Sequence, residues 1–363
     1  MTERAKESQA ASTRAPLDAL DAFNASHPMQ RSVLNAVEKS VGWAKRDHKI
    51  TVVIGPSGVG KDRLIALVTP RLAETGNAPV VVEAPPEIGS QAFSMGGLLE
   101  LILSSLGDPA PSRHTLTYGV PGLPLQSSKT GAARLVAVRN RLTAVAPAAL
   151  IINEAGYLAS GTERQQSSNI RNLTWLADQS IVPIVLVGTY SLTPLIRRNE
   201  DANRRIRPAH YPRYRDTPVQ LAGFQEATGA YDDELLRLGL RDDAFSLASI
   251  ARQLYDGTFG CVGLLSAWVR NAAERATDAK RCVTAADVKG AQSLIVADAK
   301  AFKEATTEGE IAALGLGKPL LEMDRATTTK APKLKVVGPR PPVGERRLGR
   351  DETGLGRGDA KSA

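Results

Sequence analysis

The chain has 363 residues, enough for two or three domains, and 42% of them are apolar, so a wholly disordered chain is excluded. The formal charge of +8, from 46 basic and 38 acidic residues, is concentrated in two stretches. Residues 196–215 hold seven arginines against two acidic residues, and residues 326–363 hold nine basic residues against four acidic ones. A polyanionic partner is therefore expected at two patches and not over the whole surface.

Other classes of protein are excluded by what the chain lacks. Cys261 and Cys282 cannot form a disulfide framework or a CxxC metal site, and the four scattered histidines show no ligand spacing, which argues against zinc. No apolar run approaches the roughly 20 residues that a membrane-spanning helix needs. The first residues contain no signal-peptide core. We therefore expect a cytoplasmic protein without a membrane segment.

The pattern of elements divides the chain into four parts. Residues 1–16 are predicted to be a disordered leader, and residues 17–46 have helical periodicity. Short β-branched runs predict buried strands at 48–55, 79–84, 149–153 and 182–188. Helices are predicted between them at 61–72, 93–106, 130–145 and 162–180, with a Pro/Gly-rich connector over 107–128. Strands that alternate with helices predict an α/β domain with a parallel sheet over 17–217.

After residue 217 the pattern changes. Helices are predicted at 232–241, 243–255, 262–277 and 285–305, with no strand between them, so residues 218–305 are predicted to be a small all-α lid domain. Residues 306–363 are predicted to be a largely disordered basic tail, because they lack aromatic residues and are rich in Pro, Gly, Arg and Lys from 326 on.

The most informative motif lies between the first predicted strand and the helix that follows it. It fits the pattern G-x-x-x-x-G-K and consists of Gly55, Pro56, Ser57, Gly58, Val59, Gly60, Lys61 and Asp62. The glycines let backbone N–H groups turn inward around phosphates, and the N-terminus of the helix adds a positive field. The lysine is expected to pair with the β- and γ-phosphates. The motif predicts binding of a nucleoside triphosphate, with ATP as the expected nucleotide.

Two positions of the expected metal site depart from the usual pattern. The position that usually carries a Ser or Thr hydroxyl is Asp62, and the acidic residue expected at the end of the strand 149–153 is Asn153. One interpretation is a decayed site. The other is a charge swap, in which a carboxylate and a neutral amide replace a neutral hydroxyl and a carboxylate and still offer two oxygen donors to Mg²⁺. The sequence leaves both open.

Glu154 follows the strand directly. A glutamate in this place is the expected general base that activates water. One further predicted strand, 79–84, lies between the phosphate loop and Glu154 in sequence. This arrangement is found in ATPases that have an additional strand and a catalytic glutamate.

With these motifs the chain resembles the AAA+ ATPases of transposons, the TniB/TnsC family, and more distantly the B protein of phage Mu. The segments that carry the resemblance are VVEAPP at 81–86, LIINEA at 150–155, GTERQQ at 161–166, PIVLVGT at 183–189, Arg204 with Arg205, and YPRY at 211–214. The match spans roughly residues 27–293. The resemblance implies a P-loop AAA+ domain followed by a lid.

The resemblance also implies roles and partners. Thr189, at the end of the fourth strand, matches the sensor that contacts the γ-phosphate or the attacking water, and Arg205 matches the arginine finger that acts on a neighbour's nucleotide, with Arg204 as the fallback. It implies ATP and Mg²⁺ as cofactors, and homo-oligomers, rings or filaments, on double-stranded DNA. A transposase and other transposon proteins are the implied partners.

The composition is compatible with binding to the DNA backbone. Aromatic residues make up only 4% of the chain, which argues against a base-stacking surface for single strands. Arg113, Lys129 and Arg134, around the long connector, are the candidate contacts to phosphates. A solvated surface is the alternative for them, and a solubilising role is the alternative for the tail.

Three hypotheses remain. The first is an ATP-hydrolysing regulator of DNA transposition. The second is a non-hydrolysing, nucleotide-gated scaffold of the same fold. The third is an AAA+ protein that resembles a helicase loader.

Overall fold

The computed structural model describes residues 14–44, 49–86, 93–112, 116–118, 126–128, 131–197, 205–292 and 299–313. The chain divides into two compact units, Met1–Leu321 and Glu322–Ala363, and all described residues belong to the first.

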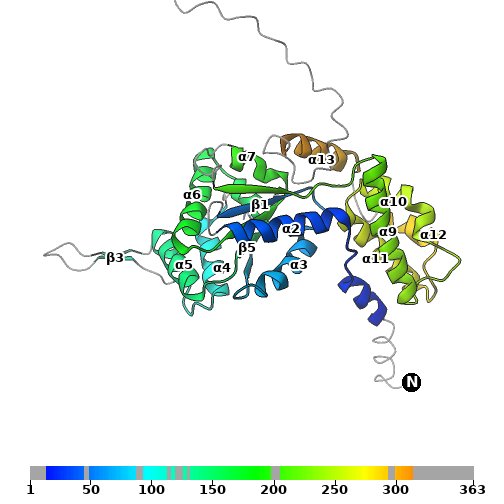
Figure 1. Cartoon of the computed structure of the whole chain (residues 1–363), viewed down its shortest axis with the longest axis horizontal. Helices are drawn as coiled ribbons and strands as arrows, with labels where there is room; N and C mark the ends of the chain where they lie inside the picture. Colours follow the sequence, from blue (N-terminus) through cyan, green and yellow to red (C-terminus); the bar gives the residue numbers. More distant parts are fainter. Residues whose placement is uncertain are drawn as a thin grey trace, which may run out of the picture. The chain divides into compact units, whose positions relative to one another are not determined.

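Five parallel strands form the central sheet in the order β2-β5-β6-β1-β7 (Figure 1). Their bounds are Ile50–Ile54 for β1, Val80–Glu83 for β2, Leu150–Asn153 for β5, Ile184–Gly188 for β6 and Ile206–His210 for β7. The three inner strands are buried at every residue, which explains their continuous Val, Ile and Leu runs. The predicted parallel sheet is confirmed.

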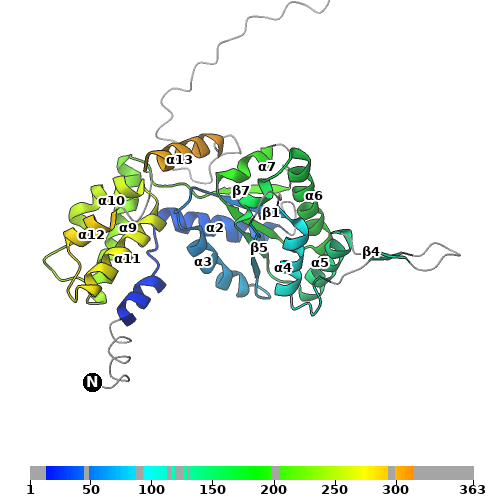
Figure 2. The same ribbon diagram turned by 180° about the vertical axis from the view of Figure 1, so that it is seen from behind.

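Helices cover both faces of this sheet. On one face, α2 and α3 pack against Val53, Ile151 and Val185, together with residues of the helical domain. On the other face, α4, α5 and α6 pack against a core that includes Val52 and Ile152 (Figure 2). The helix bounds are Pro28–Trp43 for α2, Lys61–Ala73 for α3, Met95–Ser105 for α4, Gly131–Val145 for α5 and Glu163–Ser180 for α6. Neighbouring residues of one strand thus serve two separate cores.

The strand β7 is absent from the sequence-based prediction, which treated its segment only as a basic patch. It lies at the edge of the sheet and pairs with β1 alone, with Val52 opposite Pro208. Proline is tolerated on an edge strand because its missing N–H can face away from the neighbouring strand. The connector contains another pair of strands that was not predicted, the antiparallel β3 (Leu116–Tyr118) and β4 (Gln126–Ser128).

The single helix predicted over 17–46 is two helices. Residues 14–22 form the first, and α2 begins only at Pro28. His27 caps α2, because its side chain accepts a hydrogen bond from the backbone N–H of Gln30, and the fixed φ of proline suits the first helical position. The break brings residues 23–27 next to the phosphate loop.

After β7 the described residues form helices joined by loops and turns, with no strand among them. The bounds are Pro218–Arg237 for α9, Ala251–Thr258 for α10, Val262–Asp278 for α11 and Ala285–Ala291 for α12, with a 3₁₀ turn, η3, at Leu247–Ile250. Trp268 of α11 is fully buried among them, and its Nε1–H donates to the carbonyl of Val288 at 2.6 Å. The predicted all-α domain is therefore present, although α9 begins earlier and ends earlier than the first helix predicted there.

The last described helix, α13, runs from Ala299 to Ala313. Residues 306–313, which the prediction placed in the largely disordered tail, are helical in the structure. Thr306, Glu310 and Ala313 of this stretch are buried, which explains why it is ordered despite its polar composition.

Candidate nucleotide site

The predicted phosphate loop, residues 55–60, joins the end of β1 to the start of α3. Gly60 precedes the first helical residue and has φ = +106°, a value that L side chains rarely adopt. The first amides of α3, which have no partner within the helix, therefore point toward the loop. This is the geometry of an anion site, with backbone N–H groups and the positive end of a helix dipole facing one point.

Lys61 is largely buried, and its ammonium group donates to the carbonyl of Pro56 at 2.8 Å. Burial lowers its pKa, and the carboxylates of Glu154 and Asp62 oppose that shift. A cation held in this way, with only backbone carbonyls as hydrogen-bond acceptors, is poised to pair with phosphate oxygens that enter the loop.

The structure brings Asp62 and Asn153 together, although 91 positions separate them in sequence. The amide Nδ2 of Asn153 donates to Oδ1 of Asp62 at 3.0 Å, and Asn153 is buried while Asp62 is exposed. The two departures from the expected motif are therefore one interacting pair. A single carboxylate with an amide oxygen beside it matches the preference of Mg²⁺ for one or two protein oxygens plus phosphate and water.

Glu154 follows β5 with φ = 49° and ψ = 32°, a left-handed conformation for a residue other than glycine. Such a conformation costs of the order of 1 kcal/mol or more, and it is typical of functional sites. It ends the strand abruptly, begins the 3₁₀ turn η1 (Ala155–Ala159) and leaves the carboxylate exposed. The side chain is thus available to a water molecule beside the phosphate loop.

Thr189 lies directly after β6, at the start of the 3₁₀ turn η2 (Tyr190–Leu192). Its hydroxyl is 2.9 Å from the hydroxyl of Ser191. A Cβ added at Gly156 would come within 2.6 Å of Oγ of Ser191, so this turn packs directly against the turn that follows Glu154. The predicted base and the predicted sensor therefore stand on neighbouring strand ends.

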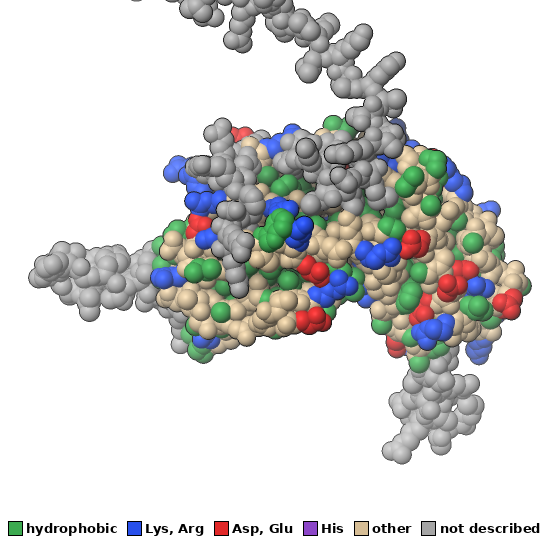
Figure 3. All heavy atoms as spheres, viewed as in Figure 1, with side chains coloured by type: hydrophobic (Ala, Val, Ile, Leu, Met, Phe, Trp, Pro, Cys, Tyr) green, Lys and Arg blue, Asp and Glu red, His purple; other side chains and the backbone are tan. Residues whose placement is uncertain are grey.

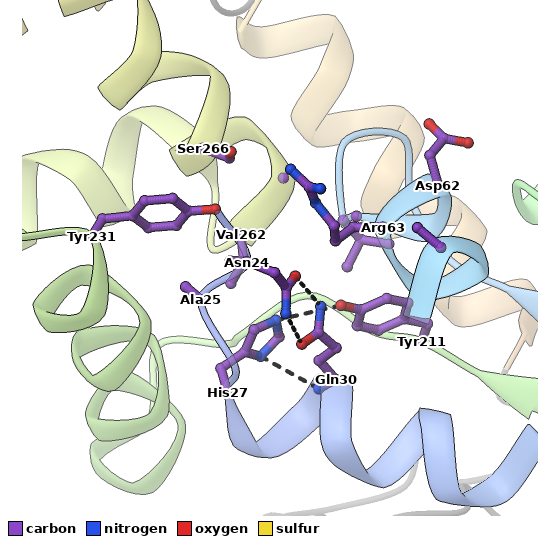
Figure 4. A pocket seen from close by; sticks show the side chains of 14 residues that line it. Asn24, Ala25, His27, Gln30, Asp62, Arg63, Tyr211, Tyr231, Val262 and Ser266 are labelled. Atoms are coloured by element: carbon purple, nitrogen blue, oxygen red, sulfur yellow. Dashed lines mark hydrogen bonds between the residues drawn. The ribbon is translucent and has the colours of Figure 1, made fainter. Parts of the chain in front are cut away.

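A cavity of about 350 Å³ adjoins the phosphate loop. Asn24, His27 and Gln30 line it on the side of α2, Gly60 on the side of the loop, and Tyr231, Val262, Gly263 and Ser266 on the side of the helical domain (Figure 4). The amides of Asn24 and Gln30 pair reciprocally, with N···O distances of 3.1 and 3.0 Å. An apolar and amide-lined cavity beside a phosphate loop has the size and chemistry to hold a nucleoside.

A network of aromatic groups holds the α2 wall of this cavity. His27 Nδ1 is 2.9 Å from the hydroxyl of Tyr214, and its Nε2 is 3.4 Å from the hydroxyl of Tyr211. Burial, followed by the positive charge of Arg31, lowers the pKa of His27 to about 3, so the ring is neutral. Because Nδ1 accepts from the backbone N–H of Gln30, the proton of the neutral ring lies on Nε2.

Sequence reasoning missed this wall. The only signal was His27 directly before Pro28, a capping residue before a proline at the first helical position, which marks a helix start inside the range predicted as one helix. Arg63 was missed as well. Its guanidinium donates to the carbonyls of Asp21 and Phe23, and so ties the end of the first helix to α3.

One family model matches part of the chain. Residues 44–196 match the family model described as AAA domain. The fold is that of a P-loop AAA domain. No curated protein matches the chain.

Two solved structures that the chain is similar to are the Walker-type ATPase paby2304 of Pyrococcus abyssi and the ORC2 protein of Aeropyrum pernix in its ADP form. The first has 12% sequence identity and a TM-score of 0.46, with 79% of this chain and 74% of that chain covered. The second has 18% identity and a TM-score of 0.45, with 73% and 66% covered.

Arg205 lies at the amino ends of the strands, whereas the phosphate loop lies at their carboxyl ends. Its carbonyl accepts from the N–H of Ile50 at the start of β1, so the length of a five-residue strand, about 16 Å, separates it from the loop of its own chain. Its side chain is 47% exposed and forms an ion pair with Asp178. The phosphate loop of its own chain is therefore out of reach of this side chain. Its fallback, Arg204, lies outside the described residues.

Of the three candidate contacts to DNA, the structure describes only Arg134. Arg134 of α5 pairs with Glu100 of α4 at 2.9 Å. Arg113 and Lys129 lie outside the described residues. On the face seen in Figure 3, basic and acidic side chains are interspersed over the described surface.

Among the described residues, no group of three or more His, Cys, Asp or Glu side chains could hold a metal ion. No described helix combines the length and the apolar character that a membrane span requires.

Proposed function

We propose that this protein is an ATP-dependent regulator of DNA transposition that forms homo-oligomers on double-stranded DNA and recruits a transposase to the target. The observation that supports nucleotide-driven action best is the convergence of Lys61, Asp62 with Asn153, Glu154 and Thr189 at the carboxyl ends of β1, β5 and β6. The transposon-specific part rests on the resemblance of the segments around these residues to the TniB/TnsC family.

In this proposal each residue has a defined task. The loop amides and Lys61 bind the phosphates and offset their charge, while Glu154 accepts a proton from the attacking water. Thr189 orients that water or the γ-phosphate. Mg²⁺, when bound with ATP, would neutralise charge that develops on the phosphate oxygens, and Asp62 and Asn153 are the residues that would hold it.

Hydrolysis in this scheme depends on a second subunit. Arg205 is far from its own phosphate loop and half-exposed, so it is placed to complete the site of a neighbour. Because one face of a subunit would then meet a different face of the next, the assembly would be a ring or a filament. DNA would be bound through phosphates, with the basic tail and Arg134 as contributors, which predicts weak sequence preference and strong dependence on salt.

The hydrogen bond between Asp62 and Asn153 favours one alternative. If the amide N–H₂ stays on the carboxylate when ATP binds, the pair blocks its own metal position, and the protein is a nucleotide-gated scaffold that assembles without hydrolysis. The helicase-loader hypothesis shares the same fold, and neighbouring genes distinguish it, since a transposase gene beside this one supports transposition.

A phosphate-release assay with and without duplex DNA tests the proposal. Wild type is compared with Lys61→Ala, which should lose nucleotide binding, and Glu154→Gln, which should bind ATP and assemble but not turn over. DNA-stimulated release in the wild type that both variants lack supports the enzyme. ATP-dependent assembly on DNA without release in the wild type supports the scaffold. Absence of any ATP-dependent DNA binding refutes both.

The DNA contacts are tested by the salt dependence of affinity. If Arg134 neutralises a phosphate, Arg134→Ala should reduce the slope of log K against log salt by about one unit. Its partner variant, Glu100→Gln, serves as the control, because it removes the ion pair and keeps the cation.

A further inference from the structure

The helix α13 lies between α7 and α10 in both ribbon views (Figure 1; Figure 2), so it touches the AAA domain and the helical domain at once. The sequence-based prediction placed the last helix at 285–305 and expected no helix beyond residue 305. The contacts that hold it are few and well defined.

On the AAA side, α13 rests on the turn that follows β6. Gly309 packs so closely on Tyr190 that a Cβ added there would lie 2.2 Å from the ring. Arg197, in the short helix α7 (Thr193–Arg197), donates to the carbonyl of Ala312. Tyr190 directly follows Thr189, the predicted sensor, so α13 sits on the turn that borders the nucleotide site.

A buried ion pair ties α13 to the entrance of the helical domain. The Nε of Arg213 lies 3.0 Å from Oε1 of Glu310, and its Nη2 lies 3.3 Å from Oε2. The two side chains are only 10% and 6% exposed. The guanidinium also stacks on the ring of Phe259 at 3.6 Å, at the corner between α10 and α11, and Lys303 of α13 lies 5.3 Å from the centre of the same ring. Two cations therefore connect α13 to Phe259 at this corner: Lys303, which belongs to α13, and Arg213, which Glu310 of α13 binds.

The same corner carries the start of α11, which closes over the phosphate loop. The backbone N–H of Leu264 donates to the carbonyl of Gly58 at 2.9 Å, and a Cβ added at Gly263 would lie 2.5 Å from that carbonyl oxygen. The cavity beside the loop lies between α2, the loop and this end of α11. Movement of this end of α11 away from the loop would therefore widen the cavity.

The first half of α13 is less tightly packed than the second. A cavity of about 550 Å³ lies between it and α10, lined by Tyr255, Phe259, Phe302 and Lys303 among others. The second half, where Thr306, Glu310 and Ala313 are buried, therefore carries most of the attachment, and a substitution at Gly309 or Glu310 is expected to loosen it.

We propose that α13 is a strap that ties the corner of the helical domain to the AAA domain and thereby slows the release of nucleotide. The strap itself rests on contacts within the chain, and only its effect on release rests on the proposed nucleotide binding. By fixing Arg213 and Tyr190 at once, α13 opposes the movement of α11 that opens the cavity.

Two variants of the full-length chain loosen the strap, and one serves as the control. Glu310→Gln removes the charge that holds Arg213, and Gly309→Val forces α13 off Tyr190. Glu308→Gln makes the same change at an exposed glutamate two positions before Glu310 and is the matched control. Each is measured by hydrogen exchange at the amides of residues 306–313 and of Leu264, and by the dissociation rate of a fluorescent ADP analogue. Circular dichroism confirms that each variant is folded.

Both loosening variants should expose residues 306–313 and Leu264 to exchange and release the analogue at least about tenfold faster, while the control matches the wild type. The reversed pair Arg213→Glu with Glu310→Arg should bring the rate back toward that of the wild type. Exposure of residues 306–313 without faster exchange at Leu264 or faster release overturns the proposal, and so does unchanged protection of residues 306–313. If the wild type binds no analogue, the proposed function is refuted. The strap is then tested by hydrogen exchange at Leu264 alone, which the loosening variants should accelerate.

Discussion

The pair formed by Asp62 and Asn153 can be tested by restoring the residues usual for the motif. The three variants are Asp62→Thr, Asn153→Asp and the double variant. Asp62→Thr replaces the charged acceptor of the hydrogen bond of 3.0 Å by a neutral hydroxyl, whereas Asn153→Asp removes its donor and places a second carboxylate beside the first. The double variant has a hydroxyl facing a carboxylate, which restores a hydrogen bond with the same formal charge. If the two departures are one charge swap, the double variant should recover what each single variant loses.

The structure sets the expected size of these effects. A hydrogen bond to a charged group contributes about 1.5 kcal/mol at the low end, the appropriate value for the exposed Asp62. Two carboxylates about 4 Å apart repel by about 4 kcal/mol at an effective dielectric constant of 20, and solvent reduces this to about 1–2 kcal/mol. We therefore expect the free energy of unfolding to fall by about 1 kcal/mol for Asp62→Thr and about 3 kcal/mol for Asn153→Asp. The double variant should lose less than about 1 kcal/mol.

Urea unfolding of the nucleotide-free protein measures the first cycle, and titration of Mg·ATP measures the second. A coupling free energy of about 3 kcal/mol or more in unfolding, and a double variant that binds Mg·ATP at least as well as the wild type, are the expected results. Effects on Mg·ATP affinity that add within about 0.5 kcal/mol would sink the charge-swap interpretation, because residues that share no function add in this way.

Three further predictions concern the lid and the wall of the cavity. Gly263→Val should weaken ATP binding by about 1–3 kcal/mol, measured by calorimetry, because its side chain would collide with the carbonyl of Gly58; unchanged affinity would contradict this. Burial lowers the pKa of His27 to about 3, so between about pH 6.5 and pH 3 the unfolded chain binds a proton that the folded chain does not, and stability falls as the pH falls. His27→Gln should remove a slope of about 1.4 kcal/mol per pH unit from urea unfolding curves in that range, and equal slopes would refute the neutral buried ring. Trp268→Phe, which loses the hydrogen bond to Val288 and leaves a gap, should lower the free energy of unfolding by about 2 kcal/mol, and a fully tolerated substitution would show that the lid repacks.

The inner strands and the phosphate loop could be predicted because their signals are local. β1, β5 and β6 are buried on both faces, so each is a continuous apolar run; β5 ends at Asn153, β6 ends at Gly188, and Gly55 follows the last residue of β1. In a parallel sheet the carboxyl ends of all strands lie on the same side. The position of Lys61, Glu154 and Thr189 just after three strands was therefore enough to predict that they lie at the same end of the sheet. The roles assigned to them remain predictions.

The edge strand β7 could not be predicted from the same signal. Its burial follows no regular period, since Ile206 and Ala209 are buried while Arg207 and Pro208 between them are half-buried, and neither Arg nor Pro favours a strand. Its place is set by pairing with β1, a contact between distant segments. The break before α2 was missed because the prediction joined Leu20 and Phe23 to the apolar positions from Val33 onward as one helix, and only the cap at His27 marks the new start.

The ion pair of Arg213 and Glu310 is a contact that the composition of the tail could not predict. Glu310 lies in a stretch whose polar residues predict disorder, yet its side chain is 6% exposed. A carboxylate is buried at this cost only where a partner compensates it, and the partner is 97 positions away. Breaking the pair from either side leaves a buried charge without compensation, which is why single substitutions should release α13 while the reversed pair retains it. An acidic residue that the sequence assigns to a solvated tail thus becomes the residue on which the attachment of the last described helix depends.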